Sequence, residues 1–231
     1  MPLSLEQSSG CTHQIKAVIF DMDGLLLDTE TLSFDSFVTT AARYGIVVGI
    51  GHYENMIGLN AATGINVLRS ILPANMDAVA FKNEWLAVYR ELLRGYVPVK
   101  DGALKFLAIL EQLHIPRAVA TSSSGSKARS ILKKTGLMQY IQHVTGGDEV
   151  GAGKPAPDVY LDAAKKLGIN PVDCLAFEDS NNGTTAALAA GMKVIQIPDL
   201  GPSNRLSNPP KLHICKTLEE GASLIGLSIN S

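Results

Sequence analysis

The chain has 231 residues, 46% hydrophobic and 18% charged, which suits one large domain or a medium domain with a smaller insert. Its net charge of −2 and the absence of any run of Lys or Arg make nucleic acid a poor candidate for a partner. No apolar stretch is long enough to span a bilayer, and three scattered cysteines predict a reducing, cytoplasmic setting rather than a disulfide framework.

The first predicted strand follows an N-terminal tail over 1–13, which we expect to be disordered because it is rich in Ser and Gln. After Lys16, an apolar run over 17–20 is short enough to be a buried strand, and it ends at Asp21, with Asp23 and Gly24 just beyond. Two acids at the mouth of a strand repel each other and lose hydration. They therefore indicate a bound cation, or an attacking carboxylate beside one that handles protons. A solvated turn is the alternative interpretation of this segment alone.

A block of helices without a convincing strand is predicted over 29–97. Apolar side chains recur at helical spacing over 34–41 and again over 81–92. A third helix is expected to be capped by Asn60 and to end before Pro73. A helical block inserted after the first strand predicts a separate lid domain, from which the chain returns near 95–98.

From Asp101 onward, segments typical of strands and helices alternate along the chain. The strand segments are apolar and rich in β-branched residues, so we expect a parallel sheet covered by helices on both faces. The predicted helices span 101–114, 125–135, 158–167 and 182–190, and the predicted strands span 116–120, 140–144, 173–177 and 193–197.

Three further groups of polar residues follow predicted strands. Thr121 and Ser122 precede a helix N-terminus, where hydroxyls and free amides can hold a phosphate oxygen. Lys154 stands in a Gly- and Pro-rich loop that lacks the spacing of a Walker loop, and Glu178 with Asp179 forms a second acidic pair. Each group alone is also compatible with an ordinary helix cap or surface turn. Ligands of open parallel sheets bind at this edge, so together the groups predict a pocket for a cation and a phosphoryl group.

Taken in order, these motifs resemble those of the haloacid dehalogenase-like hydrolases over nearly the whole chain from Ile15 onward. The resemblance implies a Rossmann-like α/β core over 14–28 and 98–231, with an α-helical cap inserted over 29–97. Within the family the chain is most similar to the β-phosphoglucomutase-like subgroup, which includes sugar-phosphate and pseudouridine-5′-phosphatase-like phosphatases. The four motifs are Asp21-Met22-Asp23-Gly24 with Asp28-Thr29, Thr121-Ser122, Lys154-Pro155, and Glu178-Asp179-Ser180 with Gly183.

The resemblance also implies roles for the acidic residues. Asp21 would be the nucleophile and Asp23 the general acid/base. Mg²⁺ would be held by the carboxylates of Asp21 and Asp179 and by the backbone carbonyl of Asp23, with Glu178 nearby or binding through water.

The same resemblance assigns the groups that contact the substrate. Thr121, Ser122 and Lys154 would bind the transferred phosphate, and the lysine would offset the repulsion between the attacking carboxylate and an anionic phosphoryl group. Gly58 and Asn60, in the cap, would contribute to substrate specificity.

These roles describe a Mg²⁺-dependent phosphatase that cleaves a small sugar or nucleoside phosphate through an aspartyl-phosphate intermediate. Two departures speak against a mutase: Ser33 stands where the mutases have a histidine, and no arginine occurs near Gly58. A phosphosugar mutase and a catalytically silent phosphate-binding protein stay as alternatives, although a binder has no use for both Asp21 and Asp23. The expected partner is a small phosphate ester, with no nucleic acid and no membrane, and a monomer is favoured.

Overall fold

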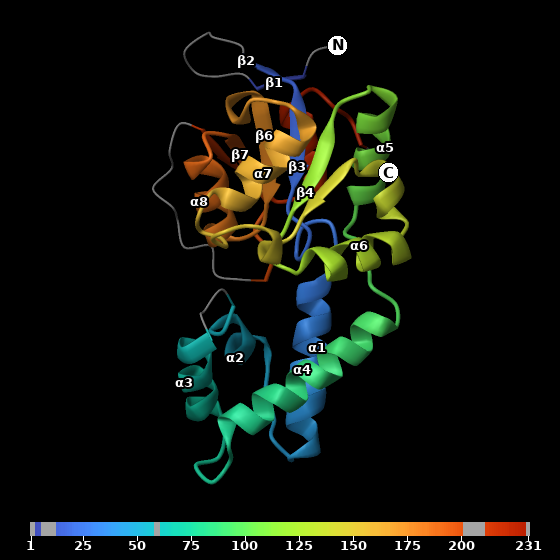
Figure 1. Ribbon diagram of the computed structural model, residues 1–231. Coiled ribbons are helices and arrows are strands. Elements are labelled where there is room, and N and C mark those ends of the chain that lie inside the picture. Colours follow the sequence, from blue (N-terminus) through green and yellow to red (C-terminus); the bar gives the residue numbers. More distant parts are fainter. Residues whose placement is uncertain (1–2, 6–12, 58–60, 201–210, 230–231) are drawn as a thin grey trace. The chain divides into compact units, whose positions relative to one another are not determined.

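The computed structural model describes residues 3–5, 13–57, 61–200 and 211–229, and the chain divides into two compact units (Figure 1). What we call the core unit contains the described residues up to Leu27, those from Val99 to Asp199 and those from 211 onward. What we call the helical unit consists of Asp28–Pro98 together with Leu200. The division falls beside the boundaries that the sequence predicted for the cap.

A six-stranded parallel sheet forms the centre of the core unit. Its strand order is β5-β4-β3-β6-β7-β8, so β3 lies between two strands that come much later in the chain. Ile19 of β3 is opposite Ala118 on one side and Ala176 on the other. The strands are β3 (Ala17–Phe20), β4 (Arg117–Ala120), β5 (His143–Thr145), β6 (Cys174–Glu178), β7 (Lys193–Gln196) and β8 (Leu212–Ile214).

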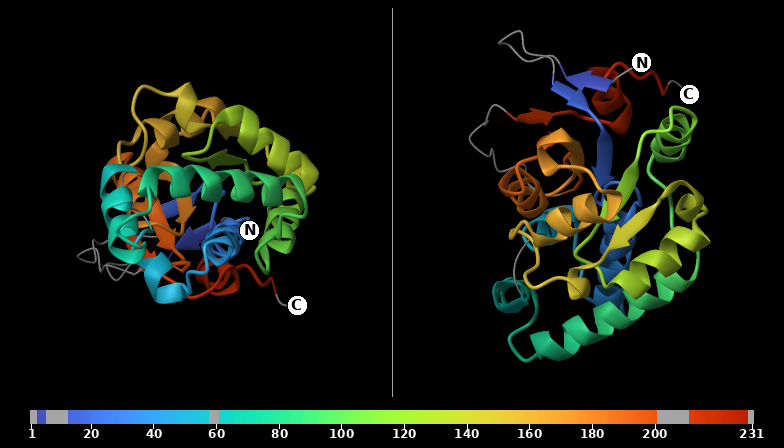
Figure 2. Two further views of the ribbon diagram at one scale, coloured as in Figure 1. Left: turned by 90° about the horizontal axis from the view of Figure 1, so that it is seen from below. Right: turned by 45° about the horizontal axis from the view of Figure 1, so that its top comes forward.

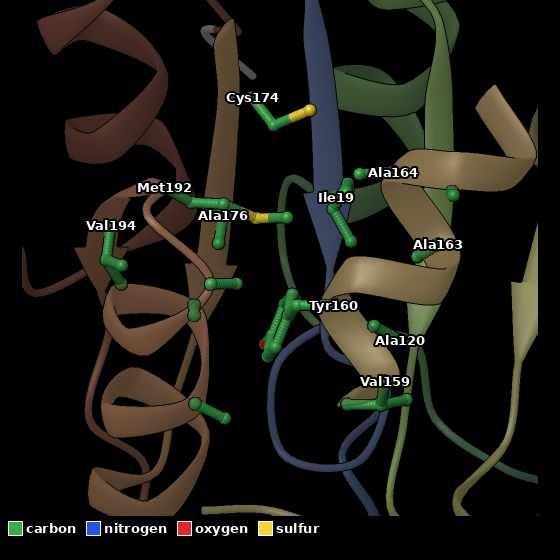
Figure 3. Packing of buried hydrophobic residues seen from close by; sticks show 14 of the residues in the cluster. Ile19, Ala120, Val159, Tyr160, Ala163, Ala164, Cys174, Ala176, Met192 and Val194 are labelled. Carbon is green, nitrogen blue, oxygen red and sulfur yellow. The ribbon is translucent and has the colours of Figure 1, made fainter. Parts of the chain in front are cut away.

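One face of the sheet is covered by α7 (Asp158–Leu167) and α8 (Asn181–Ala189) (Figure 1). Ile19 and Ala176 point toward these helices and share a buried cluster with their apolar side chains (Figure 3). All residues of β3, β4, β6 and β7 are buried. This explains why these strands appear in the sequence as continuous apolar runs rather than alternating ones.

The opposite face is covered by α5 (Ala103–Gln112) and α9 (Leu218–Leu224). Phe106 of α5 packs edge-on against Phe20 and Phe177, with ring centroids 5.4 and 5.0 Å apart. Burial of three aromatic rings here supplies a large apolar contribution to the stability of the sheet. The predicted parallel sheet with helices on both faces is therefore confirmed.

Three segments of the core unit differ from the sequence prediction. In place of a strand over 140–144, a short 3₁₀ helix at Leu137–Tyr140 follows α6 (Gly125–Lys134), and β5 begins only at His143. Strand β8 and helix α9 were not predicted. β8 has only three residues, too few to show a period of two, and α9 is two turns long.

The N-terminal tail contains two strands that we did not expect. β1 (Leu3–Leu5) pairs antiparallel with β2 (His13–Ile15), and Leu3 and Ile15 are buried. The prediction of a disordered tail is wrong for these segments. Each strand has only three residues, too few to show the alternation typical of a strand, so the Ser- and Gln-rich composition alone determined the prediction.

The helical unit contains α1 (Thr29–Arg43), α2 (Ile50–Glu54), α3 (Ala61–Ile71) and α4 (Ala78–Arg94), and no strand occurs among its described residues (Figure 2). The short α2 was not predicted. The helices pack around an aromatic cluster made of Phe34, Phe37, Tyr53, Phe81 and Trp85.

Trp85 also fixes α4 against α1 through hydrogen bonds. Its Nε1 donates to the Ser36 hydroxyl at 2.8 Å and to the Ser33 carbonyl at 3.0 Å.

Across the described residues, no helix has both the length and the apolar character that crossing a membrane requires.

Candidate active site

The two acids of the first motif stand where β3 leaves the sheet. The Asp21 amide donates to the Phe177 carbonyl at 2.9 Å, and Asp21 is buried. Gly24 has a φ of +85°, and a Cβ at this position would collide with the Asp179 carboxylate. Glycine thus permits both the turn and the close approach of Asp179. Since β3 lies where the strand order reverses, this edge is where ligands of such sheets bind.

Lys154 lies between two acids that come from different strands. Its Nζ is 2.5 Å from Asp21 Oδ1 and 2.6 Å from Glu178 Oε1. The side chains of Lys154, Asp21 and Glu178 are 4%, 8% and 0% exposed. Water and dissolved salt therefore screen these ion pairs only weakly.

Glu178 is held by hydrogen bonds at both of its carboxylate oxygens. Oε1 accepts from the Tyr160 hydroxyl at 3.1 Å, and Oε2 accepts from the Ser180 amide at 2.7 Å and the Ser180 hydroxyl at 2.9 Å. A Cβ on Gly183 would overlap the Glu178 carboxyl, so glycine is required there at the start of α8. The Tyr160 ring also lies 5.0 Å from Lys154 Nζ, a cation–π distance. Glu178 therefore fixes the position of the Lys154 ammonium.

Burial and neighbouring charges shift the pKa values of Lys154, Asp21 and Tyr160. Burial alone lowers the pKa of Lys154, but the charges of Asp21 and Glu178 outweigh burial and raise it well above its ordinary value. Burial raises the pKa of Asp21 to about 8, although the Lys154 ammonium opposes this rise. Burial and the Glu178 charge raise the pKa of Tyr160 well above its ordinary value, so its hydroxyl keeps its proton and donates.

Three acids converge on one point beside Lys154. One carboxylate oxygen from each of Asp21, Glu178 and Asp179 lies within 4.8 Å of the others. Hard divalent cations bind oxygen ligands at this kind of spacing, and the repulsion within the group favours a cation between them.

The Asp23 carboxylate faces the loop that follows β4. Its Oδ2 accepts from the Ser123 hydroxyl at 2.8 Å and lies 3.4 Å from Thr121 Oγ1. Thr121 is buried, whereas Ser122 is exposed. Asp23 Oδ1 is also buried, and no hydrogen-bond partner for it occurs in the described part of the chain.

The structure thus brings the sequence-derived residues of the core unit to one edge of the sheet, while Gly58 and Asn60 lie outside the described residues. Sequence reasoning missed Ser123 and Tyr160. Ser123 lies in a run of three serines, which gives no signal for choosing among them. Tyr160 does carry a signal, because it lies beside Val159 on the buried side of α7.

A family model described as haloacid dehalogenase-like hydrolase matches residues 18–197. The chain belongs to this family. Among curated relatives, the phosphorylated carbohydrates phosphatase of Thermotoga maritima is 34% identical, over 78% of this chain and 84% of that protein. The fructose-1-phosphate phosphatase of Escherichia coli K12 is 32% identical, over 78% of this chain and 95% of that protein.

Solved structures of the family share the fold. The crystal structure of a family IA, variant 3 hydrolase from Entamoeba histolytica superimposes with a TM-score of 0.68 at 28% identity, covering 92% of this chain and 100% of that one. The resemblance of the motifs to the haloacid dehalogenase-like hydrolases is therefore confirmed, and the chain is an enzyme of the hydrolase class.

Proposed function

We propose that this haloacid dehalogenase-like hydrolase is a Mg²⁺-dependent phosphatase that cleaves a small phosphomonoester through an aspartyl-phosphate on Asp21. The phosphatase relatives support the broader part of this proposal, that the chain is a phosphoric monoester hydrolase. The observation that carries the finer statement is the buried Lys154 ammonium 2.5 Å from Asp21 Oδ1, at the edge where the acidic residues converge. A nucleophilic carboxylate needs such a cation to approach an anionic phosphoryl group.

The first step transfers the phosphoryl group to the protein. An Asp21 carboxylate oxygen attacks phosphorus, the bond from phosphorus to the ester oxygen breaks, and Asp23 gives its proton to the departing alkoxide. Lys154 offsets the negative charge on the phosphoryl oxygens, and the Thr121 and Ser122 loop supplies hydrogen-bond donors.

The second step releases phosphate and restores both acids. A water molecule loses a proton to Asp23 and attacks phosphorus, and the bond to Asp21 breaks. Inorganic phosphate leaves, Asp21 returns as a carboxylate and Asp23 is protonated for the next cycle. One proton donor thus serves the first step as an acid and the second as a base.

A divalent cation fits the residues present. The Asp21 and Asp179 carboxylates and the Asp23 carbonyl would hold it, with Glu178 outside this set because both its oxygens already accept hydrogen bonds. When bound, Mg²⁺ would neutralise negative charge on the phosphoryl oxygens and so lower their repulsion of the Asp21 carboxylate.

The substrate class that we propose is a sugar or nucleoside phosphate, with specificity contributed by the helical unit, including Gly58 and Asn60. The phosphorylated-carbohydrate and fructose-1-phosphate phosphatases among the relatives support a sugar phosphate. We favour a phosphatase over a mutase because Ser33 takes the place of the mutase histidine, and its carbonyl bonds Trp85 inside the helical unit.

Mass spectrometry of acid-quenched protein tests the proposal. With p-nitrophenyl phosphate, Asp23→Asn should still be phosphorylated, because the leaving group needs no proton, but should lose phosphate slowly and so gain the mass of one phosphoryl group. Asp21→Asn should show no gain and no turnover. A phosphoryl group found on another residue, or turnover by folded Asp21→Asn near the parent rate, would contradict the assignment.

A further inference from the structure

The two oxygens of the Asp23 carboxylate lie in different surroundings. Oδ2 accepts a hydrogen bond of 2.8 Å from the Ser123 hydroxyl, with Thr121 Oγ1 more distant at 3.4 Å. Oδ1 is buried without a hydrogen-bond partner among the described residues. A buried carboxylate oxygen that lacks a partner is costly, so its free position calls for an explanation.

Ser123 is held in place by its backbone. Its amide donates to Thr121 Oγ1 at 3.1 Å, and its carbonyl accepts from the Gly147 amide, just beyond β5, at 2.9 Å. Two points of the sheet edge, the ends of β4 and β5, therefore determine where the Ser123 hydroxyl lies. The hydroxyl does not cap α6, whose N-cap residue is Ser124.

We propose that Ser123 is a positioning residue for Asp23: its hydroxyl holds Oδ2 and so fixes the orientation of the carboxylate, which leaves Oδ1 as the oxygen without a protein partner among the described residues. This hydrogen bond restricts rotation of the Asp23 carboxylate, because turning the carboxylate would leave the Ser123 hydroxyl without that partner. Oδ1 is then the oxygen available to the leaving group in the first step and to water in the second. This inference rests on the proposed phosphatase function.

A positioning role has a kinetic signature that depends on the leaving group. Proton transfer contributes about 10²–10⁴-fold to such reactions, and misplacing the donor loses part of that factor. For an alkyl phosphate, we expect Ser123→Ala to lower kcat/KM roughly tenfold or more, because the alkoxide needs the proton. For p-nitrophenyl phosphate, kcat/KM covers only the steps up to phosphorylation, and the leaving group needs no proton in those steps. Its kcat/KM should therefore change less than about twofold.

A double-mutant cycle with Asp23→Asn isolates the coupling between the two residues. With Asp23 already replaced, Ser123→Ala should cause no further loss on the alkyl phosphate, because the hydroxyl acts through the carboxylate. Ser123→Thr keeps the hydroxyl and should recover most of the rate. Ser124→Ala, at a neighbouring serine whose hydroxyl lies 3.5 Å from that of Ser126, is the matched control and should leave both substrates unaffected.

The outcomes separate the inference from the proposed function. Equal losses by Ser123→Ala on both substrates, or a full further loss in the Asp23→Asn background, would overturn the positioning role while the phosphatase stands. If the parent protein releases no phosphate from any ester, or if Asp23→Asn lowers both substrates equally, the proposed function fails and the inference with it. Selective loss on the alkyl phosphate, absent in the Asp23→Asn background, supports the inference.

Discussion

Replacing Lys154 with methionine should destabilise the protein strongly in the absence of metal. Methionine matches lysine out to Cε but lacks the ammonium, so Glu178 and Asp21 lose their shared cation. Both acids are buried, and breaking a buried ion pair by removing one partner typically costs about 3–5 kcal/mol. Glu178 keeps its bonds from Tyr160 and Ser180, and Asp21 can take up a proton because burial already raises its pKa to about 8. We therefore expect the lower end of the range, about 3 kcal/mol.

Thermal unfolding in excess chelator measures this cost. For a chain of this size, 1 kcal/mol corresponds to roughly 2–4 °C in Tm, so Lys154→Met should lower Tm by about 6–12 °C. Urea titration should show a lower midpoint with an unchanged slope, because the surface exposed on unfolding stays the same.

Lys166→Met provides a matched control on the same protein. Lys166 also faces two acids, Asp162 at 2.7 Å and Glu149 at 3.7 Å, but its side chain is 35% exposed. Surface ion pairs contribute only about 0–1 kcal/mol, so Lys166→Met should shift Tm by no more than about 4 °C. If the two variants unfold at the same temperature, burial does not set the strength of the Lys154 pairs and the reasoning fails.

Three further predictions concern the same site. Tyr160→Phe removes the hydroxyl that donates to Glu178 and should cost about 1 kcal/mol of unfolding free energy and reduce kcat/KM on all phosphate esters alike; a change in substrate order would contradict this. Activity should need Mg²⁺ and disappear in excess chelator, while Ca²⁺ should bind without supporting comparable turnover; full activity in chelator would refute a metal role. Gly183→Ala should abolish most activity because its Cβ would overlap the Glu178 carboxyl, whereas Gly64→Ala, a helical glycine with open space around it, should stabilise the fold by about 0.5–1 kcal/mol.

The fold was predictable from the sequence where the pattern of apolar residues was long and where residues typical of helix or strand ends marked its limits. Helix α7 has the predicted bounds because its apolar stripe spans three turns and Gly168, with φ of +70°, ends it. Strand β8 and the strands of the N-terminal tail were missed because three residues carry no measurable period.

The candidate site was predictable only to the level of the loops. The position of acidic residues at the ends of apolar runs predicted Asp21, Asp23, Glu178 and Asp179 as site residues, because the end of a strand fixes where the residues after it lie. The choice of Ser123 over its neighbours depends on which hydroxyl of the loop after β4 reaches Asp23, and that is a property of tertiary geometry.

The strand order has a consequence for how the protein is made. Central strand β3 leaves the ribosome first of the six. Its two neighbours in the sheet, β4 and β6, follow only after residues 28–98 of the helical unit. At bacterial to eukaryotic synthesis rates of about 5–20 residues per second, β3 waits roughly ten to thirty seconds for its second partner. Until β6 is made, the apolar residues of β3 lack one of the two strands that flank them in the sheet. The nascent chain is therefore most vulnerable to aggregation and to chaperone capture while the helical unit, built from local contacts, is already able to fold.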